Sequence, residues 1–120
     1  LNYSSSDTRN IKIATTGDTV LVNADTASSV MLVINELLSN SLEHGFRTKK
    51  SGNINIRISN EEVFAIFTIT DDGDGFQQKT NFESLGLNIV KAIVKDKLNG
   101  KIRIHSSKSG TVTEFSIKIK

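Results

Sequence analysis

The sequence has 120 residues, of which 37% are hydrophobic and 23% are charged, a balance typical of one globular domain. It contains no cysteine, which excludes disulfide bonds and zinc sites built on thiolates, and no apolar stretch approaches the roughly 20 residues that span a bilayer. The formal net charge of +2 is too small to indicate a nucleic-acid-binding face. We therefore expect one cytoplasmic domain without nucleic-acid partners or direct membrane contact.

The chain opens with a polar, serine-rich stretch, residues 1–9, which has no periodicity and is expected to be a residual linker. The domain itself is expected to cover residues 10–120. Two short apolar runs, residues 11–13 and 19–22, flank the turn residues Thr16-Gly17-Asp18. This pattern predicts two strands joined in a hairpin.

A helix is predicted from Asp25 to about Glu43, with Gly45 ending it and Thr26 or Ser28 available as its N-cap. Its expected apolar stripe contains Val30, Met31, Val33, Ile34, Leu37, Leu38 and Leu42.

Two strands are predicted after a basic loop at residues 47–52. In the first, Ile54, Ile56 and Ile58 alternate with polar residues. The second, residues 63–70, is almost continuously apolar or β-branched, as expected of a central strand. Asp71 shares the parity of its inward residues, so its carboxylate should point toward the covered face.

A second helix is predicted at residues 85–98, with Ile89, Val90, Ile93 and Val94 inward and Asn99-Gly100 as its stop. Two strands follow, at 101–105 and 113–118, with inward residues Ile102, Ile104, Thr113, Phe115 and Ile117. The element order favours an α/β two-layer sandwich, in which helices cover one face of a mixed, mostly antiparallel sheet.

Three polar residues, Glu36, Asn40 and His44, recur every four positions at one edge of the first helix. A carboxylate and an amide one turn apart form the oxygen-rich pair that a phosphate-bound Mg²⁺ prefers. The same residues could instead be surface or capping residues, and His44 a plain surface histidine.

The segment Asp71-Asp72-Gly73-Asp74-Gly75-Phe76 closes the central strand. A carboxylate at a strand end can accept the amino proton of adenine, and the two glycines let the backbone pass close to a flat ring. A tight turn is the alternative, whereas the spacing of a calcium-binding loop is not met. Further on, Gly86 lies where a loop becomes a helix, which suits either phosphate binding or close packing.

Together these segments resemble the GHKL (Bergerat-fold) ATP-binding domains, specifically the catalytic domain of sensor histidine kinases. Residues 35–44 resemble the N box, residues 71–76 the G1 box and residues 84–90 the G2 box. Residues 77–83 resemble the short lid of a compact-lid branch, and Ser84 replaces a glycine found in many members.

The resemblance implies that Asp71 accepts the adenine amino group, assisted by Thr113, with Thr111 as a competitor for that role. Gly73 and Gly75 would shape the adenine wall, and Leu85, Gly86 and Leu87 would belong to the nucleotide site. In the N box, Asn40 would ligate Mg²⁺, His44 would lie near the phosphates, and Glu36 would be the candidate catalytic base.

The implied activity is histidine kinase catalysis, in which MgATP donates its γ-phosphoryl group to a histidine on a separate helical dimerisation and phosphoacceptor domain. A response regulator would act downstream. Neither His44 nor His105 lies in a phosphoacceptor motif, and Arg47, Lys49 and Lys50 are expected to be solvated. The alternatives are an anti-sigma-type serine kinase and a non-catalytic nucleotide-binding module.

Overall fold

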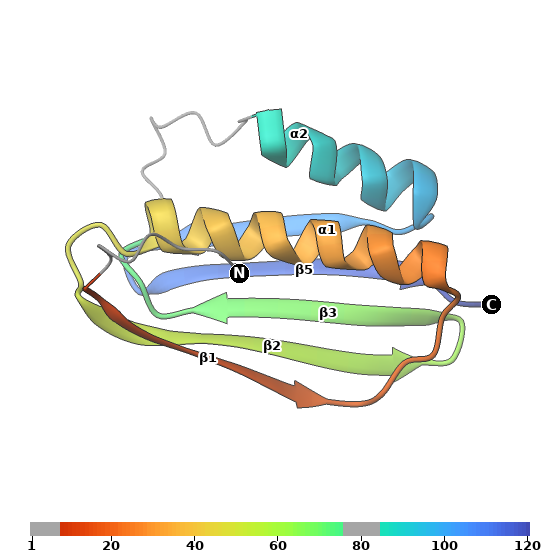
Figure 1. Cartoon of the computed structure of the whole chain (residues 1–120), viewed down its shortest axis with the longest axis horizontal. Helices are drawn as coiled ribbons and strands as arrows, with labels where there is room; N and C mark the ends of the chain where they lie inside the picture. The colour runs from red at the N-terminus through yellow and green to blue at the C-terminus, as the bar shows by residue number, and fades with distance from the viewer. Residues whose placement is uncertain (1–7, 76–84) are drawn as a thin grey trace.

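The computed structural model describes residues 8–75 and 85–120, in which two helices cover one face of a five-stranded sheet (Figure 1). The sheet has the order β1-β2-β3-β5-β4. Its strands are β1 (Asn10–Gly17), β2 (Ser51–Glu61), β3 (Phe64–Asp71), β4 (Ile102–Ser107) and β5 (Gly110–Lys118). The helices are α1 (Ala24–Asn40) and α2 (Leu85–Ala92), which continue as the π-helical turns η1 (Ser41–Gly45) and η2 (Ile93–Lys97).

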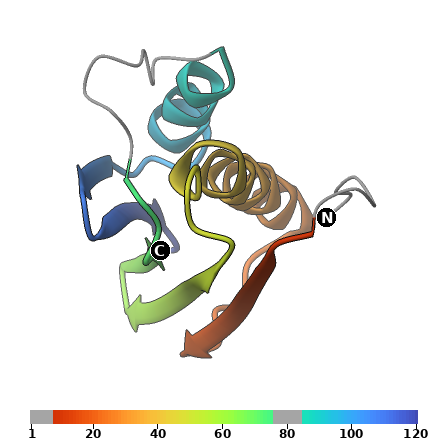
Figure 2. The ribbon, with the colours of Figure 1, turned by 90° about the vertical axis from the view of Figure 1, so that its left-hand side faces the viewer.

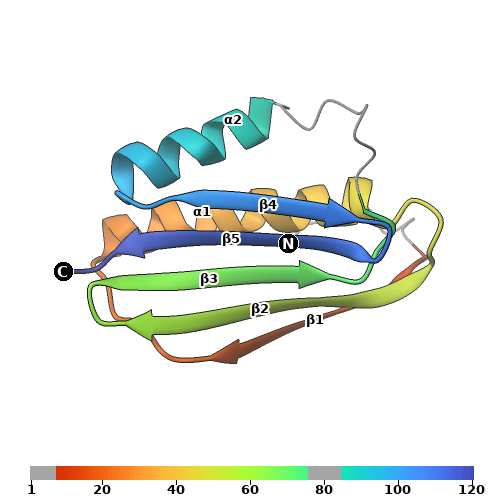
Figure 3. The ribbon, with the colours of Figure 1, turned by 180° about the vertical axis from the view of Figure 1, so that it is seen from behind.

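The predicted two-layer sandwich is confirmed. Viewed from behind, the other face of the sheet carries no described element (Figure 3). Strand β1 pairs with β2 in parallel and the remaining pairs are antiparallel, so the sheet is mixed and mostly antiparallel. Within the described part of the chain, no helix is long and apolar enough to cross a bilayer.

The predicted hairpin around Gly17 is wrong, because the chain leaves the sheet there. Gly17 has a φ of +100°, and a Cβ on it would lie 2.1 Å from the carbonyl oxygen of Ile58. The next residue, Asp18, donates its N–H to Ile58 O and accepts the N–H of Asn60, which fastens the turn to the end of β2. Helix α1 then supplies the crossover that a parallel β1-β2 pair requires.

Helix α1 begins one residue earlier than predicted, and its N-cap is Asn23 rather than Thr26 or Ser28. The side chain of Asn23 accepts the N–H of Thr26 over 2.8 Å. Met31 and Ile89 were both predicted to face inward, but their side chains are 53% and 50% exposed. Met31 follows the buried Val30, and Ile89 precedes the buried Val90. A step of one residue along a helix rotates the side chain by about 100°, which turns both side chains away from the core.

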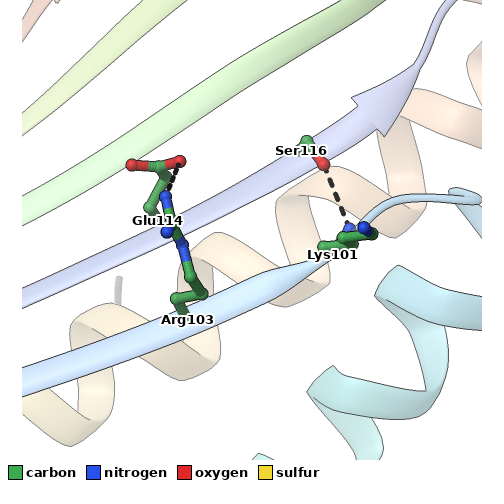
Figure 4. A network of polar contacts seen from close by, with 4 residues as sticks. All are labelled: Lys101, Arg103, Glu114 and Ser116. Carbon is green, nitrogen blue, oxygen red and sulfur yellow. Dashed lines mark hydrogen bonds and ion pairs between the residues drawn. The ribbon is translucent and has the colours of Figure 1, made fainter.

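The core lies between the helices and the sheet, and its centre is a pair of aromatic rings. Phe67 on β3 and Phe115 on β5 are cross-strand partners. Their ring centroids are 4.8 Å apart and their ring planes are nearly parallel. Seen end on, the twisted sheet curves beneath both helices (Figure 2). At the β4 edge of the sheet, Arg103 forms an ion pair with Glu114, and the N–H of Lys101 donates to Ser116 Oγ (Figure 4). Both contacts join β4 to β5.

Candidate functional site

The first helix ends in a π-helical turn that keeps a polar residue against the sheet. Leu37, Ser41 and Gly45 follow one another at intervals of four, and all three are buried. The N–H of Ser41 donates to the carbonyl oxygens of Leu37 and Leu38, so the α-helical bonding continues to the first residue of η1. The side chain of Ser41 is directed toward Asp71 at the end of β3.

Asp71 is the buried centre of the site. Its side chain is 3% exposed, as its strand parity predicted. Ser41 Oγ donates to Oδ2 over 2.9 Å, while the N–H groups of Gly73 and Thr111 donate to Oδ1 over 3.0 and 3.2 Å. These donors compensate the cost of burying the carboxylate and hold it in one orientation. Because a carboxylate oxygen can accept two bonds, Oδ2 keeps capacity for a further donor.

Both candidate threonines lie on the covered face of β5. Thr111 is the register partner of Asp71 and Thr113 that of Ile69, and both are buried. The backbone N–H of Thr111 reaches Asp71, whereas its hydroxyl pairs with Ser106 Oγ over 2.9 Å. The structure therefore brings Thr111 into direct contact with Asp71, and Thr113 lies two positions along the same face.

The two glycines after Asp71 lie where the backbone is closely approached by other segments. A Cβ on Gly73 would lie 2.1 Å from the carbonyl oxygen of Gly45, the last residue of η1. Gly75 has a φ of +77°, and a Cβ there would lie 1.9 Å from the carbonyl oxygen of Ser107. Neither position has room for a side chain, so the glycine turn lies against η1 on one side and the β4-β5 hairpin on the other.

The other two carboxylates of this turn bind neighbouring backbone. Asp72 accepts the backbone N–H and the side-chain amide of Asn53, and these bonds lower the pKa of Asp72. Asp74 accepts the backbone N–H and the hydroxyl of Thr48, which lowers the pKa of Asp74 to about 2. Within residues 8–75 and 85–120, no cluster of three His, Cys, Asp or Glu side chains is arranged to hold a metal ion.

The predicted polar residues of the first helix differ in their exposure. Glu36 is half-buried and touches the start of α2, because a Cβ on Gly86 would lie 1.8 Å from Glu36 Oε1. Asn40, the last residue of α1, is also half-buried. His44 lies in the π-helical turn, its side chain is 56% exposed, and its Nε2 is 3.8 Å from Glu43 Oε2. The structure thus brings Glu36 against Gly86, places Asn40 one turn further along α1, and leaves His44 at the surface.

The third motif is described only in part. Leu87 is buried in the core at 4% exposure and Gly86 is half-buried. Leu85 begins α2, and its side chain lies outside the described residues. Phe76, Ser84 and the predicted short lid at 77–83 also lie outside them.

The basic loop after η1 is exposed at Arg47, Lys49 and Lys50, as predicted, but two of these side chains also bind the glycine turn, which was not predicted. Arg47 Nη2 donates to the carbonyl oxygen of Gly75 over 2.9 Å. Lys49 Nζ donates to the carbonyl oxygens of Asp72 and Gly73 over 2.8 and 3.3 Å. These contacts join segments more than 20 residues apart in sequence, and no local pattern indicates them.

One residue of the predicted linker is also fixed to the site. Arg9 Nη1 donates to the carbonyl oxygens of Leu42 and Phe46 over 2.6 and 3.0 Å. Carbonyl groups at a helix end have no partner within the helix and carry partial negative charge. The guanidinium of Arg9 therefore caps the end of η1, a role that its place in a serine-rich stretch does not indicate.

Comparison with known proteins connects this geometry to one family. The sequence model of the histidine kinase-, DNA gyrase B-, and HSP90-like ATPases matches residues 25–120. The chain is 31% identical over 112 residues to the sensor histidine kinase PdtaS of Mycobacterium tuberculosis strain H37Rv, covering 90% of this chain and 22% of that protein. It is 30% identical over 115 residues to blue-light-activated histidine kinase 2 of Erythrobacter litoralis, covering 91% of this chain and 32% of that protein.

Solved structures give the same answer for the fold. The histidine kinase domain of the Erythrobacter litoralis EL346 blue-light activated histidine kinase superposes with a TM-score of 0.84 at 30% identity, covering 94% of this chain and 54% of that one. The catalytic domain of histidine kinase ThkA superposes with a TM-score of 0.74 at 23% identity, covering 92% and 79%. The chain spans about a fifth to a third of the length of the curated relatives.

Proposed function

Because the chain belongs to the family of histidine kinase-, DNA gyrase B-, and HSP90-like ATPases, we propose that it is the catalytic ATP-binding domain of a sensor histidine kinase. In this proposal the domain acts in the cytoplasm and donates the γ-phosphoryl group of MgATP to a histidine. That histidine belongs to a separate helical dimerisation and phosphoacceptor domain, and a response regulator receives the phosphoryl group afterwards.

The observation that carries the proposal is the oriented, buried carboxylate of Asp71 at the end of β3. Its Oδ2 can accept one more hydrogen bond, and the adenine amino group is the donor that we assign to it. Thr113, or Thr111 through its contact with Asp71, would assist. Gly73 and Gly75 would form the wall against the base, on a turn that packs closely against η1 and the β4-β5 hairpin.

The phosphates would lie toward the facing ends of α1 and α2. Leu85, Gly86 and Leu87 form the first turn of α2, and the partial positive charge at a helix N-terminus can hold anionic oxygens. The Asn40 side-chain oxygen, half-buried at the end of α1, fits a Mg²⁺ ion, which prefers oxygen ligands. Bound Mg²⁺ would neutralise phosphate charge, and His44 would lie near the phosphates from the surface. Glu36, in contact with the Gly86 position, would orient or deprotonate the attacking group.

Calorimetric titration with a non-hydrolysable ATP analogue, with and without Mg²⁺, tests this proposal first. We expect binding that is tighter with Mg²⁺, and absence of binding would contradict the proposal. Phosphotransfer to an added helical domain of a related kinase then tests the chemistry. An acid-labile product supports phosphohistidine, whereas an acid-stable product would instead identify a serine kinase.

A further inference from the structure

We propose that Asp74 is a positioning residue for nucleotide binding, which holds the glycine turn of residues 73–75 in its binding conformation through the loop of residues 46–50. This inference rests on the proposed function. We call the contacts between this loop and residues 72–75 the latch. Neither the loop nor Asp74 has a role among the residues assigned above to adenine, phosphate or Mg²⁺.

The centre of the latch is one carboxylate bound at both oxygens. Thr48 N–H donates to Asp74 Oδ2 over 2.8 Å, and Thr48 Oγ1 donates to Oδ1 over 2.7 Å. Lys49 N–H adds a longer bond of 3.4 Å to Oδ2. These bonds lower the pKa of Asp74 to about 2, so the carboxylate is ionised at every pH at which the protein would work. Two short bonds from one residue fix both the position and the rotation of Asp74.

Cationic side chains of the same loop bind the carbonyl groups of the glycine turn. Arg47 binds the carbonyl oxygen of Gly75, and Lys49 binds those of Asp72 and Gly73. On the other side of the turn, the N–H of Gly73 donates to Asp71, and the N–H of Asp74 donates to Gly45 O. The turn is therefore held from both sides, by the adenine-binding carboxylate and by the latch.

A turn with two glycines requires such external contacts. Glycine has more backbone freedom than any other residue, and Gly75 adopts a φ of +77°. If the turn were free, nucleotide binding would have to order it, and the ordering cost would weaken affinity. The latch orders the turn before a nucleotide arrives. The benefit should be shared by every ligand that carries adenine, because the turn forms the wall against the base and not against the phosphates.

Affinities for ATP, ADP and adenosine, measured by calorimetry on the wild-type chain and on Asp74→Ala, test the inference. We expect all three ligands to lose affinity by the same factor, on the order of three- to tenfold. Asp74→Asn should recover most of the loss, because its amide oxygen can accept Thr48 N–H while its NH₂ group donates to Thr48 Oγ1. Thr48→Val should weaken binding in the same way and add little on top of Asp74→Ala.

The matched control is Asp18→Ala. Asp18 is also an exposed aspartate that accepts a backbone N–H, from Asn60 over 2.9 Å, but it lies at the opposite end of β2. We expect this variant to bind all three ligands like the wild type. If Asp74→Ala fails to fold, Thr48→Val decides the question, since it only replaces the hydroxyl group of Thr48 by a methyl group of similar size.

The possible failures are distinguishable. A wild-type chain that binds none of the ligands overturns the proposed function and the latch with it. Wild-type binding that persists unchanged in Asp74→Ala or Thr48→Val overturns the latch alone. A loss confined to ATP, or an equal loss in Asp18→Ala, also overturns it, because the first indicates a phosphate contact and the second a general loss of stability.

Discussion

The hydroxyl group of Ser41 donates a hydrogen bond to Asp71 Oδ2 over 2.9 Å and thereby joins the π-helical end of the first helix to the end of the central strand. Ser41 is 5% exposed and Asp71 is 3% exposed, so this bond lies in a nearly dry environment. Its partners come from the N box and the G1 box, segments that contact each other here directly. The bond also leaves Asp71 Oδ2 oriented for one further donor.

Removing this hydroxyl group should weaken both folding and nucleotide binding. We expect Ser41→Ala to lower the free energy of unfolding by about 1.5–3 kcal/mol, because one buried hydrogen bond to a carboxylate is lost. The affinity for adenosine should fall by a few fold, because Asp71 is held less firmly. Urea unfolding and calorimetry measure the two effects. Ser29→Ala, a substitution of another buried serine on α1, is the control and should leave adenosine affinity unchanged.

Replacing the carboxylate itself should have a larger effect on nucleotide affinity. In Asp71→Asn, the amide oxygen can keep the N–H groups of Gly73 and Thr111, and the NH₂ group can donate to Ser41 Oγ, but the NH₂ group then faces the adenine amino group, which is also a donor. We expect the free energy of unfolding to fall by about 1 kcal/mol, because hydrogen bonds to a charged group become neutral ones. Adenine nucleotides should bind at least tenfold more weakly, or about 1.4 kcal/mol. An unchanged affinity in calorimetry would remove Asp71 from the adenine site.

Asn40→Ala should distinguish binding of Mg²⁺ from binding of adenine. If Asn40 ligates Mg²⁺, this variant loses the part of ATP affinity that depends on Mg²⁺, while adenosine binds as in the wild type. Titrations with and without Mg²⁺ measure the difference. Asn35→Ala is a suitable control, since Asn35 is an exposed asparagine on the same helix. Equal losses for ATP and adenosine would contradict the metal assignment.

Arg9→Ala should loosen the end of η1 without unfolding the domain. The carbonyl oxygens of Leu42 and Phe46 lose the guanidinium that caps them, and amide exchange in residues 41–46 should become faster. Hydrogen exchange followed by mass spectrometry measures this change. Arg57→Ala on β2 removes an exposed arginine away from η1 and should leave exchange in that segment unaltered.

The latch has a predictable pH dependence. The hydrogen bonds to Thr48 lower the pKa of Asp74 from 3.8, its value in the unfolded chain, to about 2 in the folded chain. The ionised carboxylate therefore stabilises the folded state at any pH above 3.8, and this contribution is lost as the pH falls through about 2. An NMR titration of the Asp74 side-chain carbonyl carbon should give a midpoint near 2, and in Thr48→Val the midpoint should move toward 3.8. A midpoint near 3.8 in the wild type would contradict the bonds to Thr48.

The sequence pattern predicted those elements whose structure depends on neighbouring residues alone. Strand β3 and the inward direction of Asp71 follow from a period of two, and the stop at Asn99 follows from a residue that tolerates a positive φ, here +51°. The pairing of β1 was not predictable in this way. Its partner β2 lies beyond a whole helix, and the turn residues around Gly17 suit a strand end as well as a hairpin.

The site was predicted to the extent that its residues follow from motifs. Asp71, Gly73 and Gly86 lie in contact with other predicted segments, but Ser41, Gly45 and Thr48 were missed. Ser41 did carry a signal, since it is a polar residue at a core-facing position four residues after Leu37. Thr48 carried none, because its partner is 26 residues away and the pairing depends on how the sheet folds.

The contact between η1 and the glycine turn implies that Gly45 and Gly73, which are neighbours in space, differ in their tolerance to substitution. A Cβ on Gly45 would lie 3.4 Å from Asp71 Oδ2, an ordinary contact distance, whereas a Cβ on Gly73 would meet the carbonyl oxygen of Gly45 at 2.1 Å. In a library of all single variants selected for function, alanine should therefore survive at position 45 and disappear at position 73. Although Gly45 and Gly73 lie on the two sides of one contact, position 45 should vary among the selected sequences and position 73 should remain glycine.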